Sequence, residues 1–375
     1  MDRMRGMKGA WVEVDLRRLD GNIAAMQGVL SGRTEPVLVV KADAYGHGLR
    51  AVVERAYLRG VRWFAVAYTA EGVAARAVAP EAKIVVLGAA DAGDLDELVE
   101  HGLITVVIDR RHGEELAAAA RQRGVTVPVH VKVDTGMGRF GVPWENAVAD
   151  VVGLDHCKGI RVEGICTHFA SVEVARPSLG PIQQERFQAI CEGVVKRAQG
   201  PIFRHASSSR AFLTHREWDL DGVRPGIALY GYGASLADGR FLTRPVLSWK
   251  TRVLMVKKVP ARFPVGYYSS YTTPAPTRIA TVAAGYADGY HRLLSNRAMA
   301  CVRGRWCKVV GRISMNWITL DVGLEGEVEP GDEVTLLGEG GGETFWADAM
   351  AKEARTIPYE VLTSIDPRAP RVYVG

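Results

Sequence analysis

The stretch Pro36-Val37-Leu38-Val39-Val40-Lys41-Ala42-Asp43-Ala44-Tyr45-Gly46 is the part of the chain that best indicates its fold class. Its unbroken apolar run predicts a buried strand, and a lysine follows directly behind it. The next residues, Tyr45-Gly46-His47-Gly48, are typical of a turn that leads into a helix. A lysine at the carboxyl end of a buried strand loses hydration, which lowers its pKa and lets its amine form a Schiff base with an aldehyde cofactor. For an arbitrary strand the ordinary alternative is a lysine that faces solvent.

Strands and helices alternate on both sides of this stretch, from about residue 10 to residue 232. The intervening segments are rich in alanine and arginine, which favour helices. Eight strands in roughly 220 residues favour a closed parallel (β/α)8 barrel, with an open doubly wound sheet as the alternative. The predicted strands are Val37 to Lys41, Trp63 to Ala67, Lys83 to Leu87, Ile104 to Ile108, Val127 to Val133, Val162 to His168, Ile202 to Ala206 and Gly222 to Tyr230.

The pattern changes near residue 240, where strands separated by turns replace the alternation. No long helix is predicted there until residues 346–351. We therefore expect a (β/α)8 barrel over residues 10–240 and a mostly-β domain over residues 241–375, together with residues 1–9. The predicted strands of this second domain are Val246 to Val259, Arg278 to Ala284, Ala300 to Ile313 and Glu333 to Leu337.

Composition excludes several classes of protein. The 375 residues are 47% hydrophobic and 24% charged, and a net charge of +5 without a basic block argues against nucleic-acid binding. The sequence contains no run of about 18 apolar residues, so we predict no membrane span. Five cysteines form no Cys-x-x-Cys pair and leave at least one unpaired, which fits a reducing compartment. Since no secretory signal follows the basic N-terminus, we expect a cytoplasmic protein.

The predicted strands bring chemically active side chains to one rim, because the carboxyl ends of barrel strands converge on a single cavity. Each has an ordinary alternative: a core histidine, a solvent-facing arginine, or serines that cap a helix. Their convergence favours a functional site, since buried charges need partners. The groups are Lys41, Lys132, Arg139, His168, Ser207 to Ser209 and Arg224.

A phosphate site is predicted on the same rim. The serines after the seventh strand and the amides of Gly226 and Ile227 after the eighth lie where such barrels usually bind phosphate. A lysine, a phosphate cradle, a histidine and an arginine together indicate pyridoxal phosphate held as an imine. We expect no metal.

With these motifs in view, the chain resembles the alanine racemases, pyridoxal-phosphate enzymes of fold type III, over nearly its whole length. The lysine motif is the most specific part of the resemblance. The matching segments are Trp11 to Leu16, Val40 to Gly48, Lys132 to Arg139, Gly164 to Phe169, Arg224 to Gly231, Gly285 to Gly289, Gly311 to Met315, and Tyr359-Glu360.

The resemblance implies an activity and two catalytic bases. The family interconverts L-alanine and D-alanine by two-base proton transfer on the cofactor's external aldimine, which supplies D-alanine for peptidoglycan. Lys41 would hold the cofactor and act as one base, and Tyr267 would be the opposing base. The tyrosine would need cationic neighbours, because its ordinary pKa is about 10.

Binding roles are also implied by the resemblance. Arg224 would face the pyridine nitrogen, where it makes a weaker electron sink than an acid would, and His168 would orient it. Arg139 would lie near the cofactor's phenolic oxygen and the substrate carboxylate, and Lys132 would match a lysine that is often carbamylated. The residues expected to bind the phosphate are Tyr45, Ser208, Gly226, Ile227 and Tyr359.

The family also implies a homodimer with shared active sites, in which Tyr267 and Met315 act across the interface and Met315 contacts the substrate. Racemisation of another small amino acid such as serine, a fold-type III decarboxylase, and a non-catalytic cofactor-binding barrel remain the alternatives. Several positions depart from the family pattern and bear on substrate preference: Asn316, Ser314, Tyr268, Ser207 and Pro358.

Overall fold

The computed structural model describes residues 9–30, 32–172, 178–233 and 241–375. The chain divides into two compact units, which we call the barrel unit and the β unit. The barrel unit comprises Asp20–Ala44 and Leu49–Thr243, and the β unit comprises Met1–Leu19, Tyr45–Gly48 and Arg244–Gly375. Residues 10–19, which the sequence assigned to the barrel domain, thus belong to the β unit. Residues 1–8 and 234–240 of the expected domains lie outside the described residues.

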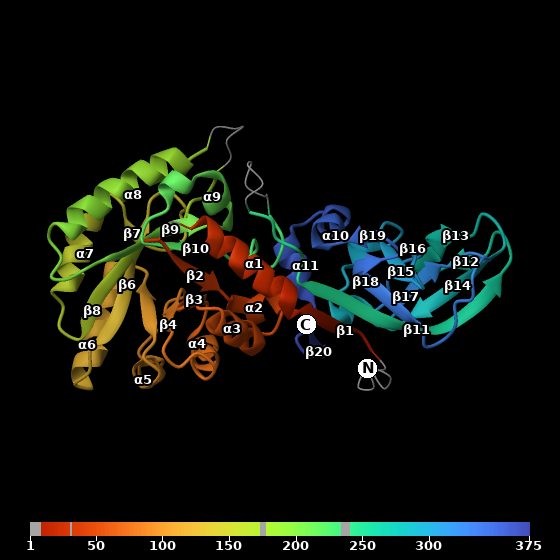
Figure 1. Ribbon diagram of the computed structural model, residues 1–375, viewed down its shortest axis with the longest axis horizontal. Helices are drawn as coiled ribbons and strands as arrows, with labels where there is room; N and C mark the ends of the chain where they lie inside the picture. Colours follow the sequence, from red (N-terminus) through yellow and green to blue (C-terminus); the bar gives the residue numbers. More distant parts are fainter. Residues whose placement is uncertain (1–8, 31, 173–177, 234–240) are drawn as a thin grey trace. The chain divides into compact units, whose positions relative to one another are not determined.

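Within the described residues, eight parallel strands of the barrel unit close into a barrel (Figure 1). The ring closes where β10 pairs with β2 and where β5 pairs with β6, which confirms the predicted (β/α)8 architecture. A short strand, β7 (Val142–Pro143), pairs in parallel with the end of β6. The barrel strands are β2 (Glu35–Val39), β3 (Trp63–Val66), β4 (Lys83–Val86), β5 (Ile104–Val107), β6 (Val127–Asp134), β8 (Ile160–Cys166), β9 (Phe203–Ser208) and β10 (Gly222–Arg224).

Helices lie outside these strands (Figure 1). Helix α6 (Arg110–Gln122) shows why they form: the Asp109 side chain accepts a hydrogen bond from the His112 amide at 2.7 Å and caps the helix, while Leu116 is buried. The other helices of the N-terminal half are α1 (Leu16–Val29), α2 (Lys41–Gly46), α3 (Leu49–Leu58), α4 (Thr69–Arg76), α5 (Leu95–Glu100), α7 (Ala147–Asp155), α8 (Gly180–Val195), α9 (Ser209–Thr214) and the 3-10 turn η2 (Arg216–Trp218).

Strand ends differ from the prediction at functionally important places. The eighth strand ends at Arg224 and does not extend to Tyr230, because Pro225 has no N–H to donate to the ladder and residues 226–230 form turns. Strand β2 ends at Val39 and β8 at Cys166. The catalytic lysine candidate and His168 therefore lie just beyond their strands, in segments whose side chains are less constrained by the ladder.

The β unit is built on a sheet whose longest strand, β11 (Leu247–Val259), pairs with β1 (Trp11–Asp15), β14 and β18. The predicted single strand over 300–313 is a hairpin instead, because Arg303 and Gly304 both have positive φ and turn the chain. Strand β17 was not predicted. The remaining elements are β12 (Pro264–Val265), η3 (Tyr267–Ser269), β13 (Tyr271–Thr272), β14 (Thr277–Val282), η4 (Tyr286–Asp288), η5 (Arg292–Leu294), β15 (Met299–Val302), β16 (Arg305–Val309), β17 (Ile318–Asp321), β18 (Glu333–Gly340), β19 (Glu343–Phe345), α10 (Ala347–Ala354), α11 (Pro358–Ser364) and β20 (Arg371–Val374).

Two further observations concern the sequence expectations. All five cysteines are free thiols. None of the helices in the described part of the chain combines the length and the apolar character that crossing a bilayer requires.

Candidate active site

Lys41 opens a turn with unusual backbone geometry. The four residues Ala42 to Tyr45 have φ between +53° and +55°, so α2 is a left-handed turn. The right-handed helix α3 begins after it at Leu49, as the predicted turn over residues 45–48 implies. For residues other than glycine this conformation costs roughly 1–2 kcal/mol each. Strain of this kind persists only where surrounding contacts impose it, and it concentrates at functional sites.

Glu71, in the first turn of α4, supplies one of those contacts. Its Oε1 accepts a hydrogen bond from the Ala42 amide at 2.6 Å, and its Oε2 accepts one from the Ala67 amide at 2.8 Å. Asp43 adds a second contact, because its Oδ1 accepts from the Leu49 amide at 2.7 Å. Glu71 was not predicted from the sequence; its place in the first turn of a helix after a barrel strand was the available signal.

The amine of Lys41 lies in a cationic environment. Burial lowers its pKa, the charges of Arg139 and Arg224 lower it further, and Glu71 opposes them. Among the described residues, no hydrogen bond or ion pair holds this amine. A half-buried lysine with a lowered pKa and no fixed partner can act as a nucleophile or a base.

Arg224 is 6% exposed and anchored by four contacts. Its Nη2 donates to the carbonyl oxygens of Thr167 at 2.8 Å and Ala206 at 2.7 Å, and lies 3.3 Å from Nδ1 of His168. Its Nη1 lies 3.0 Å from Nδ1 of His205. One N–H on Nη1 and the N–H on Nε meet no acceptor among the described residues, so Arg224 keeps donor capacity for a further group.

His168 is held neutral beside this arginine. Burial, followed by the charge of Arg224, lowers the pKa of His168 to about 3. Because arginine can only donate, Nδ1 of His168 accepts in this contact. The structure brings His168 into electrostatic contact with all four charged residues predicted on the rim: Lys41, Lys132, Arg139 and Arg224.

Lys132 and Arg139 flank a tight turn on the same rim. Lys132 is 8% exposed, and burial is the main cause of its lowered pKa. Asp134 shapes the turn, since its Oδ1 accepts from the amides of Gly136, Met137 and Gly138 at 3.0, 2.8 and 3.1 Å. Arg139 follows this turn with an exposed side chain. Both cations lower the pKa of His168, which places them within electrostatic reach of it.

The predicted phosphate residues of the barrel unit, Ser208, Gly226 and Ile227, lie at the ends of the paired strands β9 and β10. Strand β10 pairs with β9 so that Arg224 lies opposite Ser208. Ser209, one of the three serines predicted for the phosphate site, has an Oγ that accepts from the Gly226 amide at 2.9 Å and the Ala228 amide at 3.3 Å. The amide of Ile227 meets no acceptor among the described residues, although that residue is only 5% exposed. An unpaired, buried N–H beside serine hydroxyls suits an anionic oxygen.

The other predicted residues belong to the β unit. The rings of Tyr45 and Tyr359 lie 5.9 Å apart at 50°, and burial raises the pKa of Tyr45. Tyr267 opens η3 and is 63% exposed, and Met315 is 55% exposed. Their two segments approach closely, because a Cβ on Gly266 would lie 2.7 Å from the Arg312 amide nitrogen.

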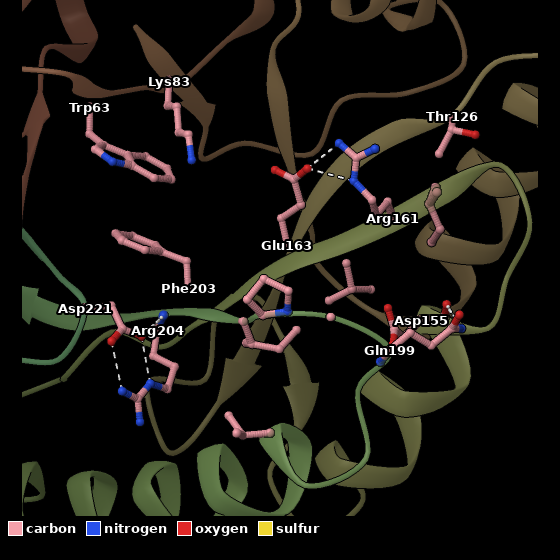
Figure 2. Close-up of a pocket in the computed structure, with 16 residues that line it drawn as sticks. Trp63, Lys83, Thr126, Asp155, Arg161, Glu163, Gln199, Phe203, Arg204 and Asp221 are labelled. Atoms are coloured by element: carbon pink, nitrogen blue, oxygen red, sulfur yellow. Dashed lines mark hydrogen bonds and ion pairs between the residues drawn. The ribbon is translucent and has the colours of Figure 1, made fainter.

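A pocket of about 950 Å³ lies at the opposite, amino-terminal end of the barrel strands (Figure 2). Its arginines are paired: Arg161 with Glu163 and, at 2.7 and 2.9 Å, Arg204 with Asp221. The Lys83 amine lies 4.6 Å from the centre of the Trp63 ring. None of the predicted cofactor-binding or catalytic residues lines this pocket. We therefore assign the candidate active site to the carboxyl-end rim.

Comparison with known proteins agrees with this assignment. Residues 14–234 match the family model of the alanine racemase N-terminal domain, and residues 246–373 match that of the alanine racemase C-terminal domain. The alanine racemase of Desulfosudis oleivorans is 40% identical over 97% of this chain and 96% of its own length.

Solved structures give the same result. The alanine racemase from Streptomyces coelicolor A3(2) superposes with a TM-score of 0.91 at 35% identity, over 100% of this chain and 99% of that one. The alanine racemase from Bartonella henselae, solved with covalently bound pyridoxal phosphate, superposes with a TM-score of 0.85 at 28% identity, over 98% of this chain and 100% of that one. These matches confirm the resemblance found in the sequence, and the chain belongs to the alanine racemase family.

Proposed function

We propose that this chain is a pyridoxal-phosphate-dependent racemase that interconverts L-alanine and D-alanine. The observation that carries the proposal is Arg224, a buried arginine with unused N–H groups in electrostatic contact with the Lys41 amine. An arginine facing a pyridine nitrogen cannot protonate it fully, which suits racemisation and limits competing reactions. A decarboxylase of the same fold would be expected to place an acid there.

The residues of the rim fit the cofactor on several counts. Lys41 offers an amine with a lowered pKa for an aldehyde, and Arg224 offers donors for the pyridine nitrogen. The Ile227 amide and the Ser208 hydroxyl offer donors for a phosphate, and the neighbouring Gly226 amide, which donates to Ser209 in this structure, would join them. We propose that Tyr45 and Tyr359 of the β unit add phenolic donors to the same phosphate.

The proposed mechanism divides the work between the cofactor and the chain. Pyridoxal phosphate, when bound, supplies an electron sink that makes the α-hydrogen of the amino acid acidic. Lys41 would move a proton on one face of the α-carbon, and its lowered pKa leaves part of the amine neutral for this task. Tyr267 would move a proton on the other face through its hydroxyl, so the reacting carbon need not turn over.

The other predicted site residues would orient groups in the active site or balance their charges. Arg139 would hold the substrate carboxylate and the cofactor's phenolic oxygen, and Met315 would border the substrate. His168, neutral because its pKa is about 3, would accept from Arg224 and fix its orientation. We also propose that Lys132 is carbamylated. Its buried amine has a lowered pKa, so it is available to CO2, and the product would be an anion within reach of the cations Arg139 and Arg224.

The exposure of Tyr267 and Met315 supports a homodimer with shared active sites. Apolar and aromatic side chains of this size are costly to leave in water, and a second copy of the chain would cover them. We propose that each β unit completes the site of its partner's barrel. A cytoplasmic enzyme of this kind would supply D-alanine for peptidoglycan.

The reaction is tested by incubating the holoenzyme with L-alanine in deuterium oxide and following optical rotation and deuterium incorporation. We expect both enantiomers to form with deuterium at the α-carbon. A parallel series with serine and other small amino acids measures the substrate range. If serine turned over faster than alanine, or if CO2 were released, the proposed substrate or reaction would be wrong.

The shared site is tested by mixing two inactive variants, Lys41→Ala and Tyr267→Ala, under conditions that exchange subunits. A mixed dimer then contains one site with both native residues, so about a quarter of wild-type activity should return at random reassembly. Native mass spectrometry confirms the exchange. Mixed dimers without recovered activity would show that each chain uses its own Lys41 and Tyr267 together.

A further inference from the structure

Two histidines continue a line of hydrogen bonds from Arg224 into the barrel interior. Neither was predicted from the sequence as a site residue. Nη1 of Arg224 lies 3.0 Å from Nδ1 of His205, and Nε2 of His205 lies 2.9 Å from Nδ1 of His130. Both histidines are fully buried. They come from β9 and β6, so the chain of contacts runs from the cofactor side of the rim across the inside of the barrel.

The direction of these hydrogen bonds follows from the chemistry of arginine. A guanidinium has donors and no acceptor, so Nδ1 of His205 must accept. A neutral His205 then carries its proton on Nε2 and donates it to Nδ1 of His130. By the same reasoning the proton of His130 is on its Nε2. Each ring therefore has one defined tautomer, and every donor points away from Arg224.

Both rings are held neutral. Burial lowers the pKa of His130 to about 3, and the charges of Lys83 and Arg224 act in the same direction. Burial and the charge of Arg224 also place the pKa of His205 well below its ordinary value. A doubly protonated ring at either position would put a cation beside the guanidinium, which this environment opposes.

The hydrogen bonds that run from Arg224 through His205 end at an unsatisfied donor on His130. Nε2 of His130 has no hydrogen-bond partner among the described residues. The ring packs against the stacked rings of Trp63 and Phe203, whose centroids are 4.3 Å apart and which Figure 2 shows among the residues that line the amino-end pocket. Gly164 leaves the space, because a Cβ there would lie 2.8 Å from Nε2 of His130.

An unsatisfied buried N–H destabilises the folded state, and an apolar side chain at position 130 would avoid that cost. Packing alone therefore does not account for a histidine here. The feature that an apolar residue cannot supply is the Nδ1 acceptor for His205.

We propose that His130 is a positioning residue: by accepting the Nε2 proton of His205, it keeps Nδ1 of His205 available to anchor Arg224. The hydrogen-bond pattern stands on the structure, and its consequence for catalysis rests on the proposed function. If His205 lost this partner, its proton could move to Nδ1, and two donors would then face each other at Arg224. The guanidinium would lose one anchor and the fixed orientation of its unused N–H groups.

The test compares wild-type holoenzyme with two variants of nearly equal size, His130→Asn and His130→Leu. The asparagine offers an acceptor oxygen in place of Nδ1, and the leucine offers none. Long-range ¹H–¹⁵N spectra of histidine-labelled protein report the tautomer of each ring. We expect His205 to carry its proton on Nε2 in wild type and in His130→Asn, and its ¹⁵N shifts to move toward those of mixed tautomers in His130→Leu.

Kinetics supply the second readout. In His130→Leu we expect kcat to fall about tenfold at an unchanged KM, as is typical when a supporting hydrogen bond behind an active-site group is lost, and in His130→Asn to recover most of this loss. A wild-type spectrum with the His205 proton on Nδ1 would overturn the proposal. So would wild-type shifts and wild-type kcat in His130→Leu.

These readouts separate the two proposals. The tautomer pattern is measured without turnover, so an enzyme that shows the pattern but does not racemise alanine would refute the proposed function alone. Should His130→Leu fail to fold, wild type and His130→Asn still decide, because an asparagine variant with mixed His205 tautomers contradicts the acceptor role.

Discussion

The two ends of the barrel both carry basic side chains, but these side chains differ in their burial and in their pairing with carboxylates. At the amino end, Arg161 and Arg204 pair with carboxylates, and Lys83 is exposed to water (Figure 2). At the carboxyl end, Lys132 and Arg224 are buried, and among the described residues no carboxylate forms an ion pair with either.

The comparison teaches that the number of charges does not mark the active site of this barrel. Charges that are paired near water contribute little to stability and are chemically quiet. Buried cations without counter-charges are costly, so they persist where a ligand or a modification completes them. By this criterion the carboxyl-end rim is the functional end, and the pocket at the amino end is not.

The largest difference between the two ends should appear when a lysine is removed from each. Lys41→Ala should lower racemisation by at least about 10³-fold, because both the cofactor anchor and one base are lost. It should also abolish the visible absorbance of lysine-bound cofactor. Lys83→Ala is the matched control at the amino end and should keep both signals. Retained activity and absorbance in Lys41→Ala would place the chemistry elsewhere.

The substitution Lys132→Met tests whether activity needs the proposed carbamate anion on the rim. If the proposed carbamate balances the buried cations and orients Arg139, we expect kcat to fall roughly 10- to 100-fold. The control Lys83→Met should stay close to wild type. Intact-mass analysis of gently handled wild-type protein should reveal one added CO2 per chain. Wild-type kcat in Lys132→Met would show that the rim tolerates its cations without this group.

Acid should destabilise the protein through its buried histidines. The pKa values of His130 and His168 are about 3 in the folded protein, below their ordinary value near 6.5. Between these values the unfolded chain binds more protons than the folded one. The free energy of unfolding therefore falls as the pH falls, by up to about 1.4 kcal/mol per pH unit for each histidine.

Urea unfolding of wild type and His130→Asn between about pH 7 and about pH 5 measures this effect. The variant should show a shallower dependence on pH, since one buried histidine is gone. His156→Asn, on the exposed end of α7, is the matched histidine removal. Equal slopes for wild type and His130→Asn would mean that His130 is not held neutral in the folded state.

The smallest expected effect concerns the strained turn at the rim. Ala42 has φ +53°, a conformation that glycine adopts freely, so Ala42→Gly should leave the free energy of unfolding unchanged or raise it by up to about 1 kcal/mol. Ala51→Gly in the right-handed helix α3 should lower it by about 0.5–1 kcal/mol. Thermal unfolding of both variants checks the difference. Equal losses would show that the turn is not strained at Ala42.

Much of the fold followed from local pattern. Strands such as β3 and β4 begin at the predicted residues, because their apolar runs and flanking turns are local signals. The predicted element boundaries are wrong where residues with positive φ turn the chain. The left-handed turn after Val40 is held by Glu71, about 30 residues further along, and the hairpin at Arg303-Gly304 depends on positive φ at two residues.

The sequence by itself determined the alternation that makes a barrel, the family, and the rim residues from Lys41 to Arg224. Only the tertiary structure decided how those residues are held: Ser209 rather than Ser208 binds the Gly226 amide, and His205 with His130 anchors Arg224. The physical reason is distance along the chain. The two histidines are 75 residues apart, and they meet because closure of the barrel turns β6 and β9 toward one interior.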